Sequence, residues 1–243
     1  MAEISKLSGV AIAEVAKVDE VLKADIANFN GLTIPSSGPA EAGALGHWLF
    51  GPDNTSYNNL TGGADVTEQG TSPTFTTNTV VGLDFGNALQ TSIADSADLT
   101  MCIVFKATSN FQILCGTVAN PGGGASLFEQ SNSLLAVDRS GLNSTLVSTT
   151  VGNYYFAAVS LSSPNTYVTF VGLTTGNSVT TGSSVRNDGN GDLGVGNRYY
   201  NGGSGNNEIA EFIAFDSAKT STELDAIYGR STTRMSNRGI TLQ

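Results

Sequence analysis

The sequence predicts a mainly β fold, in which two antiparallel sheets pack face to face as a sandwich. From about residue 45 onward, short runs rich in Val, Ile, Thr, Phe and Tyr are interrupted by Gly, Asn, Ser or Pro roughly every 8–12 residues. The chain has 29 glycines, which suits a fold with many turns. Hydrophobic residues make up 40% of the chain and charged residues only 13%. A large core under a neutral polar surface is therefore expected.

The first 34 residues differ from the rest of the chain. They contain 8 charged residues, whereas the 209 residues that follow contain 24. A sequence motif of eleven residues is repeated three times in this segment. Its apolar positions are Ile4, Leu7, Val10, Val15, Val18, Val21, Ile26, Phe29 and Leu32.

This spacing of i, i+3 and i+6 predicts a short helical N-terminal segment with its apolar side chains on one side. The turn signals Ser8-Gly9 and Asn30-Gly31 leave two alternatives, a continuous helix or three helical turns separated by bends. So short a segment buries little surface alone. Its apolar positions therefore pack either on the same chain's β domain or on other subunits, and we favour an assembly interface.

The proposed organisation has three parts. Residues 1–34 form the assembly segment, residues 35–44 are a linker that contains Pro35 and Pro39, and residues 45–243 form the sandwich. Within the sandwich, residues 100–107 read TMCIVFKA, with apolar side chains on both faces, which predicts a central strand.

One short helix is predicted near the C-terminus. Thr220 as N-cap and Glu223 three residues later make a capping box. Leu224 and Ile227 then share an apolar face, and Gly229 is expected to end the helix in the C′ position.

Composition excludes several classes of function. The net charge of −10 and the lack of a basic run argue against nucleic-acid binding. No apolar stretch is long enough to span a membrane, and the N-terminus does not resemble a signal peptide. Cys102 and Cys115 are expected to be buried free thiols, with a disulfide between them as the alternative.

The order of the sandwich motifs resembles the laminin-G-like, concanavalin A-like jelly-roll family. The matching stretches are GHWLFGPDNTSYNNLTG, GLDFGNALQTSIADSADLTMCIVFKA, VGNYYFAAVSL and GNGDLGVGNRYYNGGSGNNEIAEFIAFDSAKTSTELDAIY, which together cover about residues 45–240. The resemblance implies a jelly-roll fold, and it transfers no binding residue because binding sites of the family lie on variable loops.

The opening repeat, SGVAIAEVAKVDEVLKADIANFNGL, is similar to N-terminal segments of tailed-bacteriophage virion proteins. This resemblance implies a particle component that is assembled in the host cytoplasm. The implied partners are other virion proteins and copies of the chain itself, as in a homo-oligomer such as a trimer.

Signatures of catalysis are not found in the sequence. A glycosidase needs two carboxylates on one strand face, and Glu208 and Glu211 are three residues apart, which predicts opposite faces. His47 is interpreted as structural rather than as part of a catalytic triad. Trp48 is expected in the core, and an exposed platform for a sugar ring is the alternative. We therefore predict that the chain is not an enzyme and needs no cofactor.

Two loops could bind ligands. Asp188, Asn190 and Asp192 alternate with glycine-rich spacing, which suits Ca²⁺ or else a solvated hairpin turn. Arg198, Tyr199, Tyr200 and Asn201 combine aromatic faces with amide groups, which suits a carbohydrate or else a polar loop.

The sequence thus favours a bacteriophage virion structural protein, a decoration of the head or a component of a fibre. The first alternative is a carbohydrate-binding adhesin that attaches to host-surface glycans. A glycan hydrolase is a further alternative, against which the predicted separation of the two carboxylates argues.

Overall fold

The computed structural model of the chain describes residues 6–7, 10–11, 28–29, 32–33, 39–84, 86–117, 124–130, 133–138, 142–162, 166–183, 191–197 and 206–243. The chain divides into two units between Pro39 and Ala40, inside the stretch that was predicted to be a linker. The second unit is the β-sandwich that the sequence predicts.

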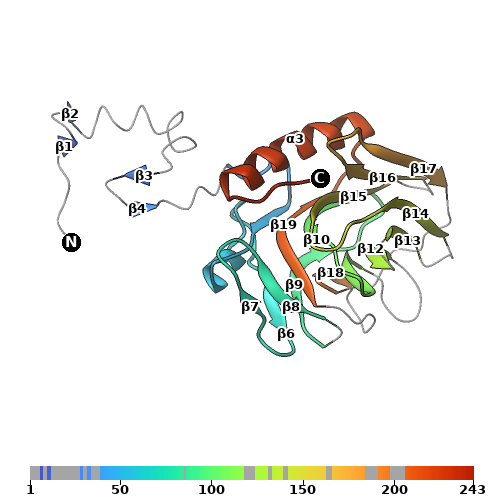
Figure 1. The fold of residues 1–243 in the computed structure, drawn as a ribbon, viewed down its shortest axis with the longest axis horizontal. Coiled ribbons are helices and arrows are strands. Elements are labelled where there is room, and N and C mark those ends of the chain that lie inside the picture. The colour runs from blue at the N-terminus through green and yellow to red at the C-terminus, as the bar shows by residue number, and fades with distance from the viewer. Residues whose placement is uncertain are drawn as a thin grey trace. The chain divides into compact units, whose positions relative to one another are not determined.

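One sheet of the sandwich contains eight strands (Figure 1). They are β5 (Gly46–Leu49), β7 (Thr74–Phe75), β8 (Val80–Leu83), β10 (Leu99–Lys106), β15 (Tyr154–Ser162), β16 (Thr166–Gly172), β17 (Ser178–Ser183) and β19 (Asn207–Phe215). Their order is β17-β16-β15-β10-β19-β8-β7, and β5 also pairs with β19. Strand β7 is therefore at one edge of this sheet.

The other sheet contains seven strands in the order β14-β13-β12-β11-β18-β9-β6. They are β6 (Thr67–Gln69), β9 (Ala88–Ala94), β11 (Gln112–Gly116), β12 (Ala125–Gln130), β13 (Ser133–Asp138), β14 (Leu142–Ser148) and β18 (Asp192–Val195). All strand pairs of both sheets are antiparallel. Strand β6 is at one edge, so loop 70–73 connects edge strands of the two sheets.

Strand β10 confirms the prediction of a central strand that is apolar on both faces. Met101, Ile103 and Phe105 lie in the core between the two sheets. Cys102 and Val104 face the opposite way and belong to a second apolar cluster under the C-terminal helix. The second face is therefore covered by a helix, not by the other sheet.

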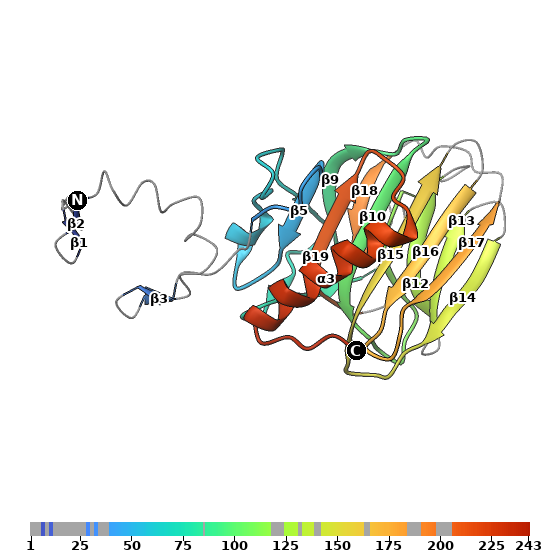
Figure 2. The same ribbon diagram turned by 90° about the horizontal axis from the view of Figure 1, so that it is seen from above.

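Helix α3 (Ser221–Asn237) lies across the outer face of the eight-stranded sheet (Figure 2). The predicted capping box at Thr220 and Glu223 is confirmed. The predicted end at Gly229 is wrong, because the helix continues for two further turns and Met235, in its last turn, packs into the apolar cluster. Among the described residues, no helix is both long and apolar enough to cross a membrane.

The structure confirms the prediction that Trp48 lies in the core. Its side chain is fully buried and stacks on Phe212, with 5.8 Å between the ring centroids. Gly46 lies beside it, where an added Cβ would come within 2.2 Å of the indole ring. The alternative of an exposed sugar platform at Trp48 is therefore excluded.

Both thiols are also buried and free, as expected. Cys102 is under the helix and Cys115 is in the core between the sheets. Burial raises the pKa of each thiol well above its usual range, so neither is poised to react as a thiolate.

In the first unit, the described residues form two short antiparallel strand pairs. These are β1 (Lys6–Leu7) with β2 (Val10–Ala11) and β3 (Asn28–Phe29) with β4 (Leu32–Thr33).

Leu7 is opposite Val10, and Phe29 is opposite Leu32. The predicted helical conformation is therefore wrong at these four residues of the proposed assembly interface. In the sequence, Ser8-Gly9 lies between the two strands of the first pair and Asn30-Gly31 between those of the second. Such dipeptides favour two-residue hairpin connections over helix. The other positions of that interface lie outside the described residues: Ile4, Val15, Val18, Val21 and Ile26.

Candidate functional site

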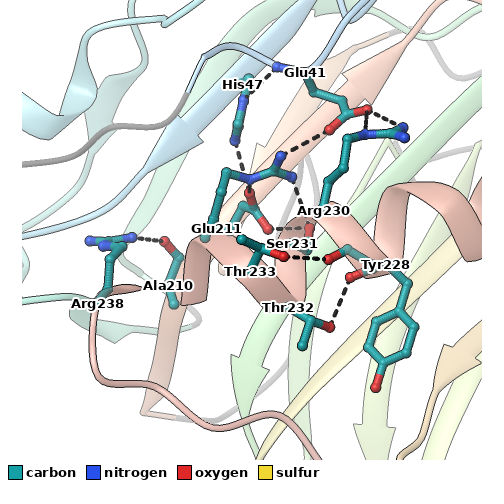
Figure 3. A network of polar contacts seen from close by, with 12 residues as sticks. Glu41, His47, Ala210, Glu211, Tyr228, Arg230, Ser231, Thr232, Thr233 and Arg238 are labelled. Atoms are coloured by element: carbon teal, nitrogen blue, oxygen red, sulfur yellow. Dashed lines mark hydrogen bonds and ion pairs between the residues drawn. The ribbon is translucent and has the colours of Figure 1, made fainter. Parts of the chain in front are cut away.

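A buried ionic cluster joins the eight-stranded sheet to helix α3 (Figure 3). Its centre is Glu211 on β19, which is 1% exposed. The Nε of Arg234 donates to Glu211 at 2.6 Å, and the hydroxyl of Ser231 donates to it at 2.5 Å. Arg234 also donates to Glu41 at 3.0 Å. Residue 41, close to the start of the second unit, is thereby tied to the helix.

His47 completes the cluster and confirms its structural interpretation. Its Nδ1 accepts a hydrogen bond from the backbone N–H of Glu41 at 2.9 Å. The proton must therefore be on Nε2, which donates to Glu211 at 2.9 Å. Both ring nitrogens are thus used, and the side chain is fully buried.

The electrostatics of this cluster favour a charged Glu211. Burial alone would raise the pKa of this carboxyl, but the hydrogen bonds from His47 and Ser231 and the positive charge of Arg234 outweigh it. The net pKa of Glu211 lies below its usual range. A carboxylate that is fully buried and accepts from three side chains stabilises the fold but offers no surface to a substrate.

The prediction that Glu208 and Glu211 lie on opposite faces of the strand is wrong. Val104 pairs with Glu211 and Phe105 pairs with Ile209, so the register shifts by one residue in a β-bulge. Both glutamates therefore face the helix side of the sheet, not opposite sides. Glu208 accepts hydrogen bonds from Lys106 at 2.9 Å and from Tyr154 at 2.5 Å.

The second candidate site is at the end of the sandwich where β18 leads into β19. Residues 198–205 connect these strands, and a buried asparagine holds each end of the connection. The amide of Asn207 donates to the carbonyl of Gly196 at 2.7 Å and to that of Ile113 at 2.9 Å. The amide of Asn197 donates to the carbonyl of Asp84 at 2.8 Å. The ends of this connection are therefore fixed to each other and to both sheets.

Neighbouring turns join the same network. The carboxylate of Asp84 accepts from Asn87 at 2.9 Å, and the amide oxygen of Asn87 accepts from the backbone of Thr71 at 2.7 Å. Gly70, with φ of +89°, lies so close to Gly86 that an added Cβ would be 1.7 Å from its carbonyl oxygen. The turns at residues 70–71 and 84–87 are thus linked by hydrogen bonds to Asn197, at the end of β18.

The predicted carbohydrate-binding residues belong to this connection. Arg198, Tyr199, Tyr200 and Asn201 lie outside the described residues, and only their attachment to the sandwich is described. Sequence reasoning missed the anchors Asn197 and Asn207. Each lies among several asparagines, and no local pattern distinguishes a buried one.

The predicted calcium loop is at the opposite end of β18. Asp192 begins that strand and pairs with Ala94 on β9, whereas Asp188 and Asn190 lie outside the described residues. No three His, Cys, Asp or Glu side chains gather as a metal site in the part of the chain that the structure describes. Calcium binding stays a prediction.

Comparisons with known proteins support the fold. No protein-family model and no curated protein matches the chain. Among solved structures, the sialidase of Trypanosoma rangeli in complex with 2,3-difluorosialic acid matches with a TM-score of 0.60 and 12% identity. The match covers 92% of this chain and 39% of the sialidase. The chain therefore spans well under half of that enzyme.

The receptor-binding domain of botulinum neurotoxin D matches with a TM-score of 0.53 and 10% identity, over 78% of this chain and 53% of that one. The botulinum neurotoxin serotype D ligand-binding domain in complex with N-acetylneuraminic acid matches with a TM-score of 0.52 and 10% identity, over 78% and 51% of the two chains. At such identities the likeness shows the β-sandwich fold alone.

These matches contradict the prediction that the chain is not an enzyme, because the first of them are sialidases. The carboxylate argument behind that prediction was also wrong, since the bulge in β19 places Glu208 and Glu211 on one face. The fold is shared by sialidases and by a toxin's receptor-binding domain, so the chain is a β-sandwich of a kind found in both.

Proposed function

We propose that this chain is a carbohydrate-binding module and that residues 198–205 form its ligand-contacting loop. The observation that carries this proposal is the anchoring of both ends of the loop by Asn197 and Asn207. A loop whose ends are fixed by a rigid scaffold is where binding residues concentrate.

The residue types of the loop suit a sugar. Tyr199 and Tyr200 offer aromatic faces, and Asn201 offers an amide that both donates and accepts hydrogen bonds. Arg198 adds a positive charge to a chain with a net charge of −10, which favours an anionic group on the ligand.

The comparisons support testing sialylated glycans first. The matched botulinum neurotoxin D domain is in complex with N-acetylneuraminic acid, and the matched sialidase is in complex with a sialic acid derivative. A carboxylate sugar of this class would pair with the guanidinium of Arg198.

A glycan array tests the proposal with the full chain, followed by titration of the best ligand. We expect binding of sialylated glycans that Arg198→Gln weakens about tenfold or more, since a charge-assisted hydrogen bond contributes about 1.5–3 kcal/mol. The matched control is Arg186→Gln, which removes the same charge from the connection at the other end of β18. Equal effects of the two variants would contradict a role of this loop.

The N-terminal unit motivates a second proposal, that of an assembly segment in a virion. Leu7 and Phe29 are 22 residues apart and occupy the same position in their strand pairs, opposite Val10 and Leu32. None of the structures reported above is a virion protein, so this proposal depends on the repeat alone. Light scattering of the full chain should show an oligomer that Phe29→Asp dissociates, and a monomeric parent chain would contradict it.

A further inference from the structure

A cluster of two half-buried aromatic side chains and two exposed polar ones lies at the edge strands β6 and β7, which loop 70–73 connects. The hydroxyl of Tyr57, at the end of the short 3₁₀ helix Asn54–Tyr57, donates to Glu68 Oε1 at 2.8 Å. The hydroxyl of Ser72 donates to the other oxygen, Oε2, at 2.6 Å. Phe75 packs on Tyr57, with 5.6 Å between ring centroids and 50° between ring planes. Glu68 is on edge strand β6 and Phe75 on edge strand β7.

The carboxylate of Glu68 is oriented but not saturated. A carboxylate can accept about four hydrogen bonds, and these two hydroxyls provide two. Burial, and then the hydrogen bond to Glu68, raise the pKa of Tyr57, so its hydroxyl keeps its proton and stays a donor. Glu68 itself is exposed to solvent. As far as the described residues go, one acceptor position on each carboxylate oxygen is thus left for an outside donor.

The rings add the apolar part of a site. Tyr57 and Phe75 are half-buried, with one side against the core between the sheets and the rest open to solvent. A ligand with an apolar face and adjacent hydroxyl donors matches this combination. Neutral sugars have both features, and their vicinal hydroxyls can each donate to one oxygen of Glu68.

The surroundings hold this cluster in place. Ser72 belongs to the connection that touches Gly86 through Gly70, and Thr71 donates to Asn87 in the network that reaches Asn197. The cluster is therefore linked by hydrogen bonds to Asn197, the residue that precedes the proposed binding loop.

We propose that Tyr57, Glu68, Ser72 and Phe75 form a second sugar subsite, one that takes a neutral sugar unit. The inference rests on the proposed function, since it assigns a further subsite to the carbohydrate-binding module. The negative charge of Glu68 repels carboxylated or sulfated sugars, which sets this subsite apart from the loop that carries Arg198.

The test uses the full chain with two sets of ligands, neutral gluco-, galacto- and manno-configured oligosaccharides and sialylated oligosaccharides. Saturation-transfer NMR detects binding, and titration then measures the affinity. We expect Glu68→Gln to weaken binding of a neutral oligosaccharide about tenfold or more, as expected for the loss of a charged acceptor. Tyr57→Phe keeps the ring but releases the carboxylate, and should weaken binding severalfold. Asp216→Asn, an exposed carboxylate beyond the other end of β19, is the matched control and should change nothing.

The outcomes separate the two proposals. If Tyr199→Ala abolishes binding of sialylated glycans and Glu68→Gln has no effect on binding of neutral sugars, the edge subsite is wrong and the proposed binding loop is supported. If Glu68→Gln abolishes binding of neutral sugars and Tyr199→Ala does not, the edge subsite is supported by itself. If no sugar binds the parent chain, both proposals are wrong. Edge strands often carry charges that prevent pairing with other chains, so stronger self-association of Glu68→Gln with unchanged binding would overturn the subsite as well.

Discussion

The helix-covered face of the eight-stranded sheet and the open edge at β6 and β7 are built around similar groups. On the covered face Glu211 accepts from a serine, a histidine and an arginine. At the edge Glu68 accepts from a tyrosine and a serine. The first carboxylate is 1% exposed and the second is open to solvent.

This difference shows how tertiary structure assigns roles to identical side chains. A buried carboxylate must be fully paired, because an unpaired buried charge costs several kcal/mol. Once it is paired it stabilises the fold and has no capacity left for a ligand. An exposed carboxylate contributes little to stability, so its remaining acceptor positions stay free for function.

The largest effect that separates the two regions is expected at Arg234. Arg234→Ala should lower the free energy of unfolding by about 3–5 kcal/mol, because it leaves Glu211 and Glu41 buried with too few partners. Urea unfolding followed by fluorescence of Trp48, the only tryptophan, measures this change.

Arg230→Ala is the control for this prediction, because Arg230 pairs with the same Glu41 but its side chain is 53% exposed. It should cost less than Arg234→Ala, about 1–2 kcal/mol, because the buried Glu41 loses the donors to one oxygen but keeps Arg234 on the other. Similar costs for the two variants would contradict the distinction between buried and exposed pairing.

A smaller effect is expected in the acid stability of the chain. Since the pKa of Glu211 in the folded state lies below its usual value of 4.5, its contribution to stability is complete above that value and is lost as the pH falls through the folded pKa. The parent chain should lose stability below about pH 4.5, and Glu211→Gln should lose less over the same interval. Unfolding curves at pH 7, 5, 4 and 3.5 test this, and parallel pH profiles of the two chains would contradict it.

The smallest effect is expected at Glu68. Glu68→Gln should change the free energy of unfolding by no more than about 0.5 kcal/mol, because the side chain is exposed and keeps its shape. Thermal unfolding beside the binding measurement checks this. A loss of several kcal/mol would mean that Glu68 stabilises the sheet edge instead of serving a ligand.

Much of the fold could be predicted from local patterns. The central strand around residues 100–107, the core position of Trp48 and the capping box at Thr220 each depend on neighbours within a few residues. The end of α3 could not be predicted, since Gly229 is a local stop signal that contacts of Met235 with the sheet override. The strand pairs around Leu7 and Phe29 show the same difficulty, because apolar spacing alone did not separate hairpin from helix.

The sequence by itself determined the fold class, the central strand around residues 100–107 and the residue types of the loop at Arg198. These depend on composition and on periodicity along the chain, which are local properties. Only the tertiary structure decided the pairing of Glu41 with Arg234, the anchoring of the loop by Asn207, and the meeting of Tyr57, Glu68 and Phe75 at one edge. It also decided the shared face of Glu208 and Glu211, because a single bulge reverses the alternation of side chains along a strand. Such contacts join residues that are up to about 190 positions apart, and only the folded sheets bring them within hydrogen-bond distance.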